Sequence, residues 1–265
     1  MRMGKRLYSV VMFFVVAILG GLLTAGLIVP MAGMISEGGK MAGDGLDSLP
    51  TELDTPPQAE RSRLLNADGT VLAFFYDENR IVEPLENIAL IMQQAQVAIE
   101  DTRFYEHGAI DPKGTLRALL STSQGNTQGG SSITQQYVRL VQIESAEANG
   151  DAKARALATE KTMARKVREL RFAVAMEKKY SKDEILTRYL NISYYGDGAY
   201  GVEAAARHYF GTTAKKLNLP QAAMLAGLVR NPVATNPVSH PPIAIERRNN
   251  VLDRMLELNI ITTEE

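Results

Sequence analysis

Cysteine is absent from this chain of 265 residues, and histidine occurs only three times. Without cysteine the chain forms no disulfide, has no thiolate nucleophile and builds no cysteine-based zinc site. The three histidines show no metal-binding spacing such as HExxH. A formal net charge of -1, from 29 basic and 30 acidic residues, provides no polycationic surface for nucleic acid. Any anion site must therefore depend on a local cluster of bases.

Nucleotide and hydrolase signatures are also missing. Gly196, Gly198 and Gly201 have GxGxxG spacing, but no parallel-sheet rhythm surrounds them and no suitable acid follows about 20 residues later. The stretch TQGGSSITQQ has neither the GK[ST] of a P-loop nor the GxSxG of a hydrolase elbow. Its dense neutral hydrogen-bonding groups suit a sugar or phosphate oxygen, although an ordinary polar turn before a helix would look similar.

A long uncharged stretch, residues 7–36, begins the chain after the basic sequence MRMGKR. As a helix, residues 7–29 would rise about 34 Å, enough to cross a hydrocarbon core of about 30 Å. A cleaved signal peptide is the alternative, but its apolar region should be only about 7 to 15 residues long. The preceding bases predict a cytoplasmic N-terminus and an extracytoplasmic remainder. We therefore expect a single-pass anchor in the cell membrane over residues 1–36.

Four further features indicate how the rest of the chain is organised. Residues 37–60 are rich in Gly, Pro, Asp and Glu and predict an acidic flexible linker. Two β-prone runs joined by Asp68 and Gly69 predict a hairpin at the start of a folded domain over residues 61–265. Ser181 and Glu184 form a capping box. Helical spacing of apolar residues, which predicts a mainly α fold, recurs over residues 86–104, 158–180, 181–191, 202–210, 218–229 and 244–258.

The densest group of titratable residues is AIEDTRFYEHGAID. Helical spacing would place Glu100, Arg103 and His107 near one face, so that a carboxylate, a guanidinium and an imidazole could converge beside Phe104. This pattern favours a site, while a salt-bridged helix end stopped by Gly108 remains the alternative.

A local cluster of bases follows between Lys161 and Arg171, where five bases accompany the single acid Glu169. Lys161, Arg165 and Glu169 are spaced by four residues along one helical stripe. The cluster indicates an anion site, although charged helices are commonly just solvated. In an outward-facing, membrane-tethered domain with a sugar-binding segment, it suggests a charged lipid-linked substrate.

Five stretches in this order resemble the serial motifs of the peptidoglycan glycosyltransferase family: EDTRFYEHG, GGSSITQQ, RKVRELRFAVAMEKKYSKDEILTRYLN, YYGDGAYGVEAAARHYFG and AAMLAGL. The resemblance covers residues 62–257. The anchor also fits the glycosyltransferase module of class A penicillin-binding proteins or the monofunctional enzymes. Ser132 stands where threonine is frequent in the family, and Arg139 where lysine is frequent. Neither difference removes a chemical role.

The resemblance implies a lysozyme-like, two-lobed fold with a cleft for lipid II as acceptor and the lipid-linked glycan as donor. Glu100 corresponds to the general base, and Glu169 to a second glutamate near the departing pyrophosphate. Asp101 would support the helix end, and residues 123–128 would form a mobile segment by the membrane. The resemblance implies these substrate-binding residues: Asp101, Arg103, His107, Ser131, Ser132, Thr134, Gln135, Gln136, Arg139, Lys161, Arg165, Asn191 and Tyr195.

The implied reaction polymerises lipid II into β-1,4 glycan with inversion and releases undecaprenyl pyrophosphate. No cofactor would be obligatory, but a divalent cation, Mg or Mn, could lie at the pyrophosphate beside Glu169. Expected partners are the membrane, moenomycin-type inhibitors and cell-wall synthesis proteins, but no nucleic acid. Neither SxxK nor KTG occurs, so this chain contains no transpeptidase domain. A lysozyme-like glycan-cleaving enzyme and a non-catalytic membrane-anchored scaffold remain as alternatives.

Overall fold

The computed structural model describes residues 53, 55, 57–109, 111 and 130–265, all within one unit of the chain. The predicted membrane anchor over residues 1–36 and the predicted mobile segment over residues 123–128 lie outside the described residues, as does most of the predicted linker. None of the helices in the described part is both long and apolar enough to span a bilayer.

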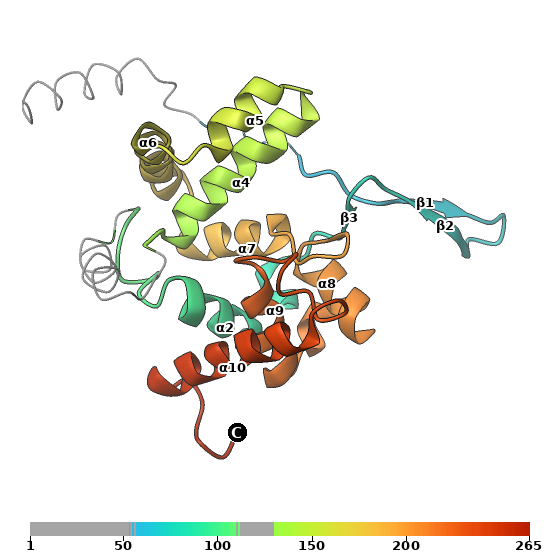
Figure 1. Ribbon diagram of the computed structural model, residues 1–265. Helices are drawn as coiled ribbons and strands as arrows, with labels where there is room; N and C mark the ends of the chain where they lie inside the picture. The colour runs from blue at the N-terminus through green and yellow to red at the C-terminus, as the bar shows by residue number, and fades with distance from the viewer. Residues whose placement is uncertain (1–52, 54, 56, 110, 112–129) are drawn as a thin grey trace, which may run out of the picture. The chain divides into compact units, whose positions relative to one another are not determined.

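Helices dominate the described residues, which confirms the mainly α prediction (Figure 1). Two groups of helices are evident: α2, α9 and α10 pack against one another, and α4 packs against α5, α6 and α7. Helix α8 contacts both α7 and α9 and so joins the two groups. The helices are η1 (Leu85–Asn87), α2 (Leu90–Glu100), α4 (Ile133–Ala148), α5 (Ala152–Thr159), α6 (Met163–Lys179), α7 (Lys182–Ile192), α8 (Val202–Phe210), η2 (Ala214–Lys216), α9 (Leu219–Leu228) and α10 (Pro241–Glu257).

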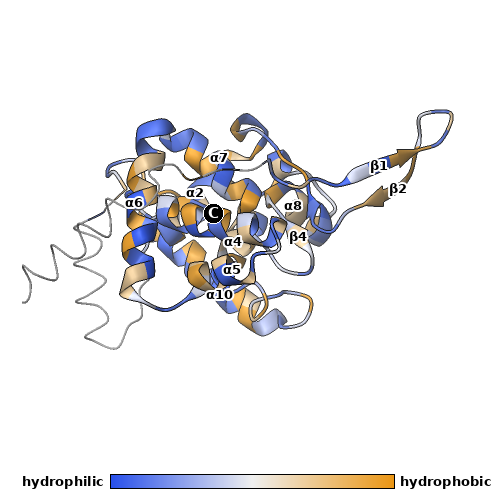
Figure 2. Ribbon diagram, turned by 90° about the horizontal axis from the view of Figure 1, so that it is seen from above, coloured by the Kyte–Doolittle hydropathy of each residue, from blue (hydrophilic) through white to orange (hydrophobic). Residues whose placement is uncertain are grey.

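The predicted hairpin is also confirmed. Strands β1 (Ser62–Leu65) and β2 (Val71–Phe75) pair antiparallel, and the turn between them contains Gly69 at φ +83°. A positive φ favours glycine because it has no Cβ. The hairpin extends away from the helices, with apolar residues on both strands (Figures 1 and 2). These large apolar side chains are exposed: Leu64, Leu65, Val71, Leu72, Phe74 and Phe75.

Two helix predictions were wrong in their extent. Helix α2 ends at Glu100, so Arg103 and His107 do not continue its face. Asp101 leaves the helical conformation at φ -158° and ψ 75° and turns its carboxylate toward the start of α4, where it accepts from Ile133 N at 3.2 Å. The single helix predicted over residues 158–180 is divided into α5 and α6, because the Thr162 side chain caps a new N-terminus by accepting from Arg165 N.

The glycine-rich turn before α8 has a packing role. Gly201 has φ +80°, and a Cβ there would lie 2.8 Å from the carbonyl oxygen of Asn191. The start of α8 therefore packs directly on the end of α7. The adjoining strands β3 (Asn79–Arg80) and β4 (Ala199–Tyr200) pair over only two residues. This arrangement agrees with the prediction that the GxGxxG spacing does not mark a dinucleotide site.

Candidate active site

Glu100 is the last residue of α2, at the place where α2 meets α4. The Nε2 group of Gln136, in the first turn of α4, donates to Glu100 Oε2 at 2.9 Å. The other carboxylate oxygen, Oε1, is buried and has no hydrogen-bond partner among the described residues. One oxygen of Glu100 is therefore held by a neutral donor, and the other is a buried acceptor that lacks a donor among the described residues.

The Gln136 amide is held from three sides. Its Nε2 group also faces the carbonyl oxygen of Ser131 at 3.4 Å, and its Oε1 accepts from the hydroxyl of Tyr189 at 3.0 Å. Tyr189 lies in α7 and is fully buried. Burial raises the pKa of Tyr189 well above its usual value, and the nearby Glu100 carboxylate raises it further. The Tyr189 hydroxyl is therefore protonated and acts as a donor at physiological pH.

A guanidinium from α10 completes the surroundings of Glu100. Burial lowers the pKa of Arg247, and the nearby Arg230 guanidinium lowers it as well, whereas the negative charge of Glu100 acts in the opposite direction. Gly227 of α9 gives the Arg247 side chain its space, since a Cβ at Gly227 would lie 3.1 Å from Arg247 Cγ. Glu100 thus has a positive charge nearby in addition to its direct bond to Gln136.

Glu169 has different surroundings, although it is also a glutamate on a helix. It is 2% exposed on α6, and its Oε2 bonds to the Arg165 guanidinium. Lys166 Nζ bonds to its Oε1 at 2.6 Å. The same ammonium donates to Ser131 Oγ and to Gln135 Oε1, both at 2.7 Å. Glu169 therefore holds two cations at the start of α4.

The consecutive residues Gln135 and Gln136 connect the two glutamates. Gln135 contacts the Lys166 ammonium that binds Glu169, and Gln136 contacts Glu100. The first turn of α4 thus separates a carboxylate with an available oxygen from a cluster of cations. Such an arrangement can remove a proton at one end and stabilise developing negative charge at the other.

Asp101, Arg103 and His107 form a set of contacts beside Glu100. His107 Nε2 lies 2.7 Å from Asp101 Oδ1, and Arg103 forms an ion pair with Asp111. Asp101 thus supports the start of α4 more than the end of its own helix. Ser132 is the N-cap of α4, with its hydroxyl accepting from the backbone N–H of Gln135 at 3.2 Å. These contacts position the segment that carries Gln135 and Gln136.

The other predicted site residues occupy two kinds of environment. Thr134, Asn191 and Tyr195 are buried; the Thr134 hydroxyl donates to Glu177, and the Asn191 amide bonds to the backbone of Glu83. Arg139 and Lys161 are exposed. A role in substrate binding stays a prediction for each of them.

Comparison with known proteins identifies the family of this chain. The profile of a family described as Transglycosylase matches residues 68–256. The chain belongs to the Transglycosylase family. It is 34% identical over 98% of its length to penicillin-binding protein 1A/1B of Bacillus subtilis, covering 26% of that protein, and 40% identical over 77% of its length to penicillin-binding protein 1A of Escherichia coli, covering 22%. It thus spans about a quarter of the length of these relatives.

Among solved structures, the transglycosylase chain is similar to the crystal structure of penicillin-binding protein 1A from Haemophilus influenzae, with a TM-score of 0.40 and 23% identity. The match covers 78% of this chain and 19% of the crystallised one.

Three residues of the candidate site were not singled out by the sequence analysis. Lys166 was counted among the bases, but the spacing by four selected Lys161 and Arg165 instead. Tyr189 and Arg247 lie within regular helical patterns and gave no local signal of function. The bond of Tyr189 to Gln136 and the electrostatic interaction of Arg247 with Glu100 arise from packing between helices that are distant in the sequence.

The predicted divalent cation at Glu169 has an unfavourable set of ligands in this transglycosylase site. Both oxygens of Glu169 already accept from cations, so a metal ion would have to displace Arg165 or Lys166. Among the described residues, the group with ligand atoms close enough to share an ion is Asp101, His107 and Asp111, all within 4.8 Å of one another. These three side chains already bond to each other or to Arg103. A divalent ion at the pyrophosphate beside Glu169 stays a prediction.

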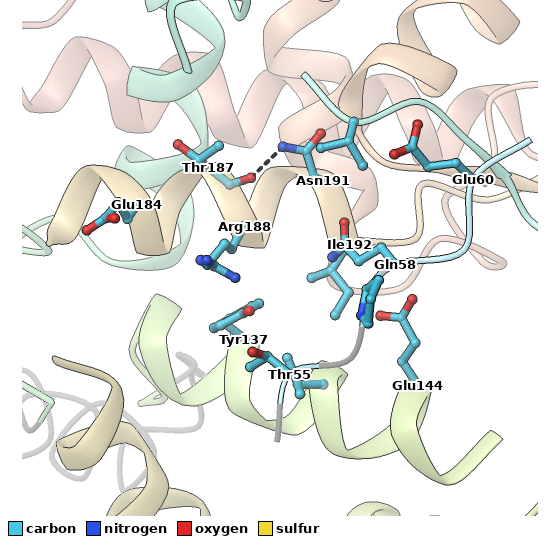
Figure 3. A pocket seen from close by; sticks show the side chains of 13 residues that line it. Thr55, Gln58, Glu60, Tyr137, Glu144, Glu184, Thr187, Arg188, Asn191 and Ile192 are labelled. Carbon is cyan, nitrogen blue, oxygen red and sulfur yellow. Dashed lines mark hydrogen bonds between the residues drawn. The ribbon is translucent and has the colours of Figure 1, made fainter. Parts of the chain in front are cut away.

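A pocket of about 560 Å³ lies between α4, α7 and the segment that precedes β1. Figure 3 shows Tyr137 from α4 and Arg188 from α7 facing each other across it, with Thr55 and Gln58 beside them. Neither Glu100 nor Glu169 lines this pocket. Its walls show that the end of the acidic segment before the transglycosylase domain lies against the helices.

Proposed function

We propose that this chain polymerises lipid II into β-1,4 glycan strands of peptidoglycan. The 4-hydroxyl oxygen of the acceptor GlcNAc attacks the anomeric carbon of the donor MurNAc and forms the new glycosidic bond. Glu100 takes the hydroxyl proton, and the bond from the anomeric carbon to undecaprenyl pyrophosphate breaks. Membership of the Transglycosylase family supports this reaction class.

The observation that carries the proposal is the available oxygen of Glu100. A general base must have a free oxygen within reach of the proton that it accepts. Oε1 is a buried acceptor without a partner among the described residues, while Oε2 is held by Gln136, so we propose that the acceptor hydroxyl donates the hydrogen bond that Oε1 lacks. Glu100 is thus oriented without being neutralised by a direct ion pair.

The cations around Glu169 support the second half of the reaction. Negative charge develops on the pyrophosphate as its bond to the sugar breaks, and fixed cations stabilise that charge. Arg165 and Lys166 are held in place by Glu169, and the exposed Lys161 lies just before the same helix. We therefore assign Glu169 to the positioning of these cations.

This assignment favours a single displacement with inversion. A covalent glycosyl intermediate would need a nucleophilic carboxylate close to the reacting carbon, about 5 to 5.5 Å from the first one. Glu169 is a poor nucleophile because both its oxygens bond to cations. We propose inversion of the α-linked donor, and a muramidase specific for β-1,4 linkages should digest the product completely.

The proposal also includes the setting of the reaction. The long uncharged N-terminal stretch supports a membrane anchor with an extracytoplasmic domain, which would bring the site to its lipid-linked substrate. Moenomycin-type inhibitors, which resemble the phosphorylated donor, should compete for the cation cluster.

The decisive experiment compares Glu100→Gln with Glu106→Gln in a lipid II polymerisation assay. The amide keeps the shape of Glu100 but cannot accept the proton, so we expect polymerisation to fall by about 10²- to 10⁴-fold. Glu106 is exposed in the turn that follows α2, and its variant should keep the parent rate.

The same assay separates the proposal from the alternatives. Incubation with polymeric glycan instead of lipid II tests for a glycan-cleaving enzyme, which would shorten the polymer. A Glu100→Gln variant with the parent's rate would contradict the assignment of the base. Failure of the parent chain to polymerise lipid II would contradict the function.

A further inference from the structure

The hydroxyl of Tyr189 is the remote end of a chain of hydrogen bonds that reaches Glu100. It donates to Gln136 Oε1 at 3.0 Å, and Gln136 Nε2 donates to Glu100 Oε2 at 2.9 Å. The three residues come from three helices, α7, α4 and α2. Tyr189 does not bond to the carboxylate itself, so any effect on it must pass through the amide.

The direction of these bonds follows from the groups around the amide. Glu100 Oε2 and the Ser131 carbonyl oxygen are both acceptors, so the end of the amide that faces them must be its NH₂ group. The amide oxygen then faces Tyr189, whose hydroxyl must act as the donor. A reversed amide would place its oxygen against two acceptors. One orientation of the Gln136 amide therefore satisfies its three partners, which are the Glu100 carboxylate, the Ser131 carbonyl and the Tyr189 hydroxyl.

We propose that Tyr189 is a positioning residue, which acts through Gln136 to keep Oε1 as the proton-accepting oxygen of Glu100. This inference rests on the proposed role of Glu100 as general base. With its oxygen anchored by Tyr189, the amide holds one oxygen of the carboxylate and fixes the carboxylate plane, so that the second oxygen keeps its direction. Without the hydrogen bond from Tyr189, the Gln136 amide oxygen would lack a donor. The amide would then turn toward another donor, and its NH₂ group would move away from Glu100 Oε2.

A matched pair of substitutions tests this role. Tyr189→Phe and Tyr209→Phe each remove one tyrosine hydroxyl that donates a hydrogen bond, but the Tyr209 hydroxyl donates to the backbone carbonyl of Tyr195 at 3.1 Å and not to Gln136. We expect Tyr189→Phe to lower kcat for lipid II polymerisation by about 3- to 10-fold, the usual worth of one hydrogen bond, with little change in KM. Tyr209→Phe should keep both constants.

A double variant separates positioning from a general loss of structure. Gln136→Ala should lower kcat by about 10-fold or more, because it removes the contact with Glu100 itself. If Tyr189 acts through Gln136, adding Tyr189→Phe to Gln136→Ala should cause no further loss. Thermal unfolding of each variant, followed by circular dichroism, reports any change in stability.

The outcomes distinguish this inference from the function on which it rests. A parent chain that does not polymerise lipid II contradicts the proposed function, and this inference with it. An active parent with an inactive Glu100→Gln variant, together with a Tyr189→Phe variant that behaves like Tyr209→Phe, overturns this inference alone. The inference is also wrong if the double variant lowers kcat by the product of the two losses measured in the single variants.

Discussion

At the scale of single residues, Glu100 and Glu169 show how one residue type occurs in two different surroundings. Glu100 has one neutral hydrogen-bond donor and one oxygen without a partner among the described residues. Glu169 is 2% exposed and has a cation on each oxygen. A carboxylate with a free oxygen can accept a proton, whereas one bound to two cations mainly fixes their positions.

Lys166 provides a residue-scale test of the cation cluster. Lys166→Met keeps the aliphatic stem but removes the ammonium that bonds to Glu169, Ser131 and Gln135. We expect kcat to fall by about 10²-fold or more, as when an electrostatic stabiliser of developing charge is removed. The affinity of a moenomycin-type inhibitor should fall as well.

Lys178→Met, at an exposed position in the last turn of the same helix, is the control for Lys166→Met and should leave both quantities unchanged. The proposed cluster would be wrong if the two variants gave equal kcat values and equal inhibitor affinities. Lys161→Ala and Arg165→Ala extend the same measurement to the two bases predicted from the sequence.

At the scale of secondary structure elements, the sequence predicted the elements that depend on interactions between residues close together in the chain. The hairpin follows from its turn residues, and α7 and α8 follow from apolar spacing and, for α7, from the Ser181 capping box. The end of α2 could not be predicted in this way. The residues after Glu100 keep helical spacing, but Asp101 turns to Ile133, 32 positions later in the chain. Periodicity within one segment contains no information on such a contact.

The residues of the candidate site also fall into those that local sequence signals predict and those that they do not. Glu100, Glu169 and the polar segment at the start of α4 were found because their motifs are contiguous in the sequence. Lys166 lies within one of these motifs, but only its contacts with Ser131 and Gln135 distinguish it from the neighbouring bases. Packing between helices, and not sequence pattern, identified this residue.

Gly201 tests how tightly α8 is joined to α7. Gly201→Ala would place a Cβ 2.8 Å from the carbonyl oxygen of Asn191, at a φ of +80°. Gly198 has a similar φ of +76° but nothing within 4 Å of its Cβ position. We expect Gly198→Ala to lower the free energy of unfolding by about 1–2 kcal/mol through backbone strain.

Gly201→Ala should lower the free energy of unfolding by about 1–3 kcal/mol more than Gly198→Ala, because overpacking adds to the same strain. Urea denaturation of the two variants measures the difference. Equal losses of stability would show that the contact with Asn191 relaxes without cost.

At the scale of the folded domain, the helices account for the core, and the hairpin contributes little to it. Residues of β1 and β2 are exposed or half-buried, while α2, α4, α7, α8 and α9 supply most of the fully buried side chains. A two-stranded hairpin is marginal by itself in water. Its exposed apolar side chains are therefore dispensable for the stability of the helices.

Substitution of the hairpin provides a test at this scale. Leu72 and Phe75 are 61% and 60% exposed, so Leu72→Ser and Phe75→Ser should change the free energy of unfolding by no more than about 0.5 kcal/mol each. Self-association, followed by light scattering, should decrease because less apolar surface is exposed. Leu190→Ser, at a fully buried position, should unfold the domain. A large loss of thermal stability in either hairpin variant would contradict this view.

The two adjacent glutamines at the start of α4 have a consequence for the spacing of the chemistry. Neighbouring residues of an α-helix differ by about 100° in direction and 1.5 Å in height. The offset between the group that contacts Glu100 and the group that contacts the cations is therefore set by the rotation and rise between two neighbouring residues of one helix. Small movements of side chains in other elements would change this offset little. A single residue inserted between Gln135 and Gln136 would instead turn the contact with Lys166 away from the contact with Glu100.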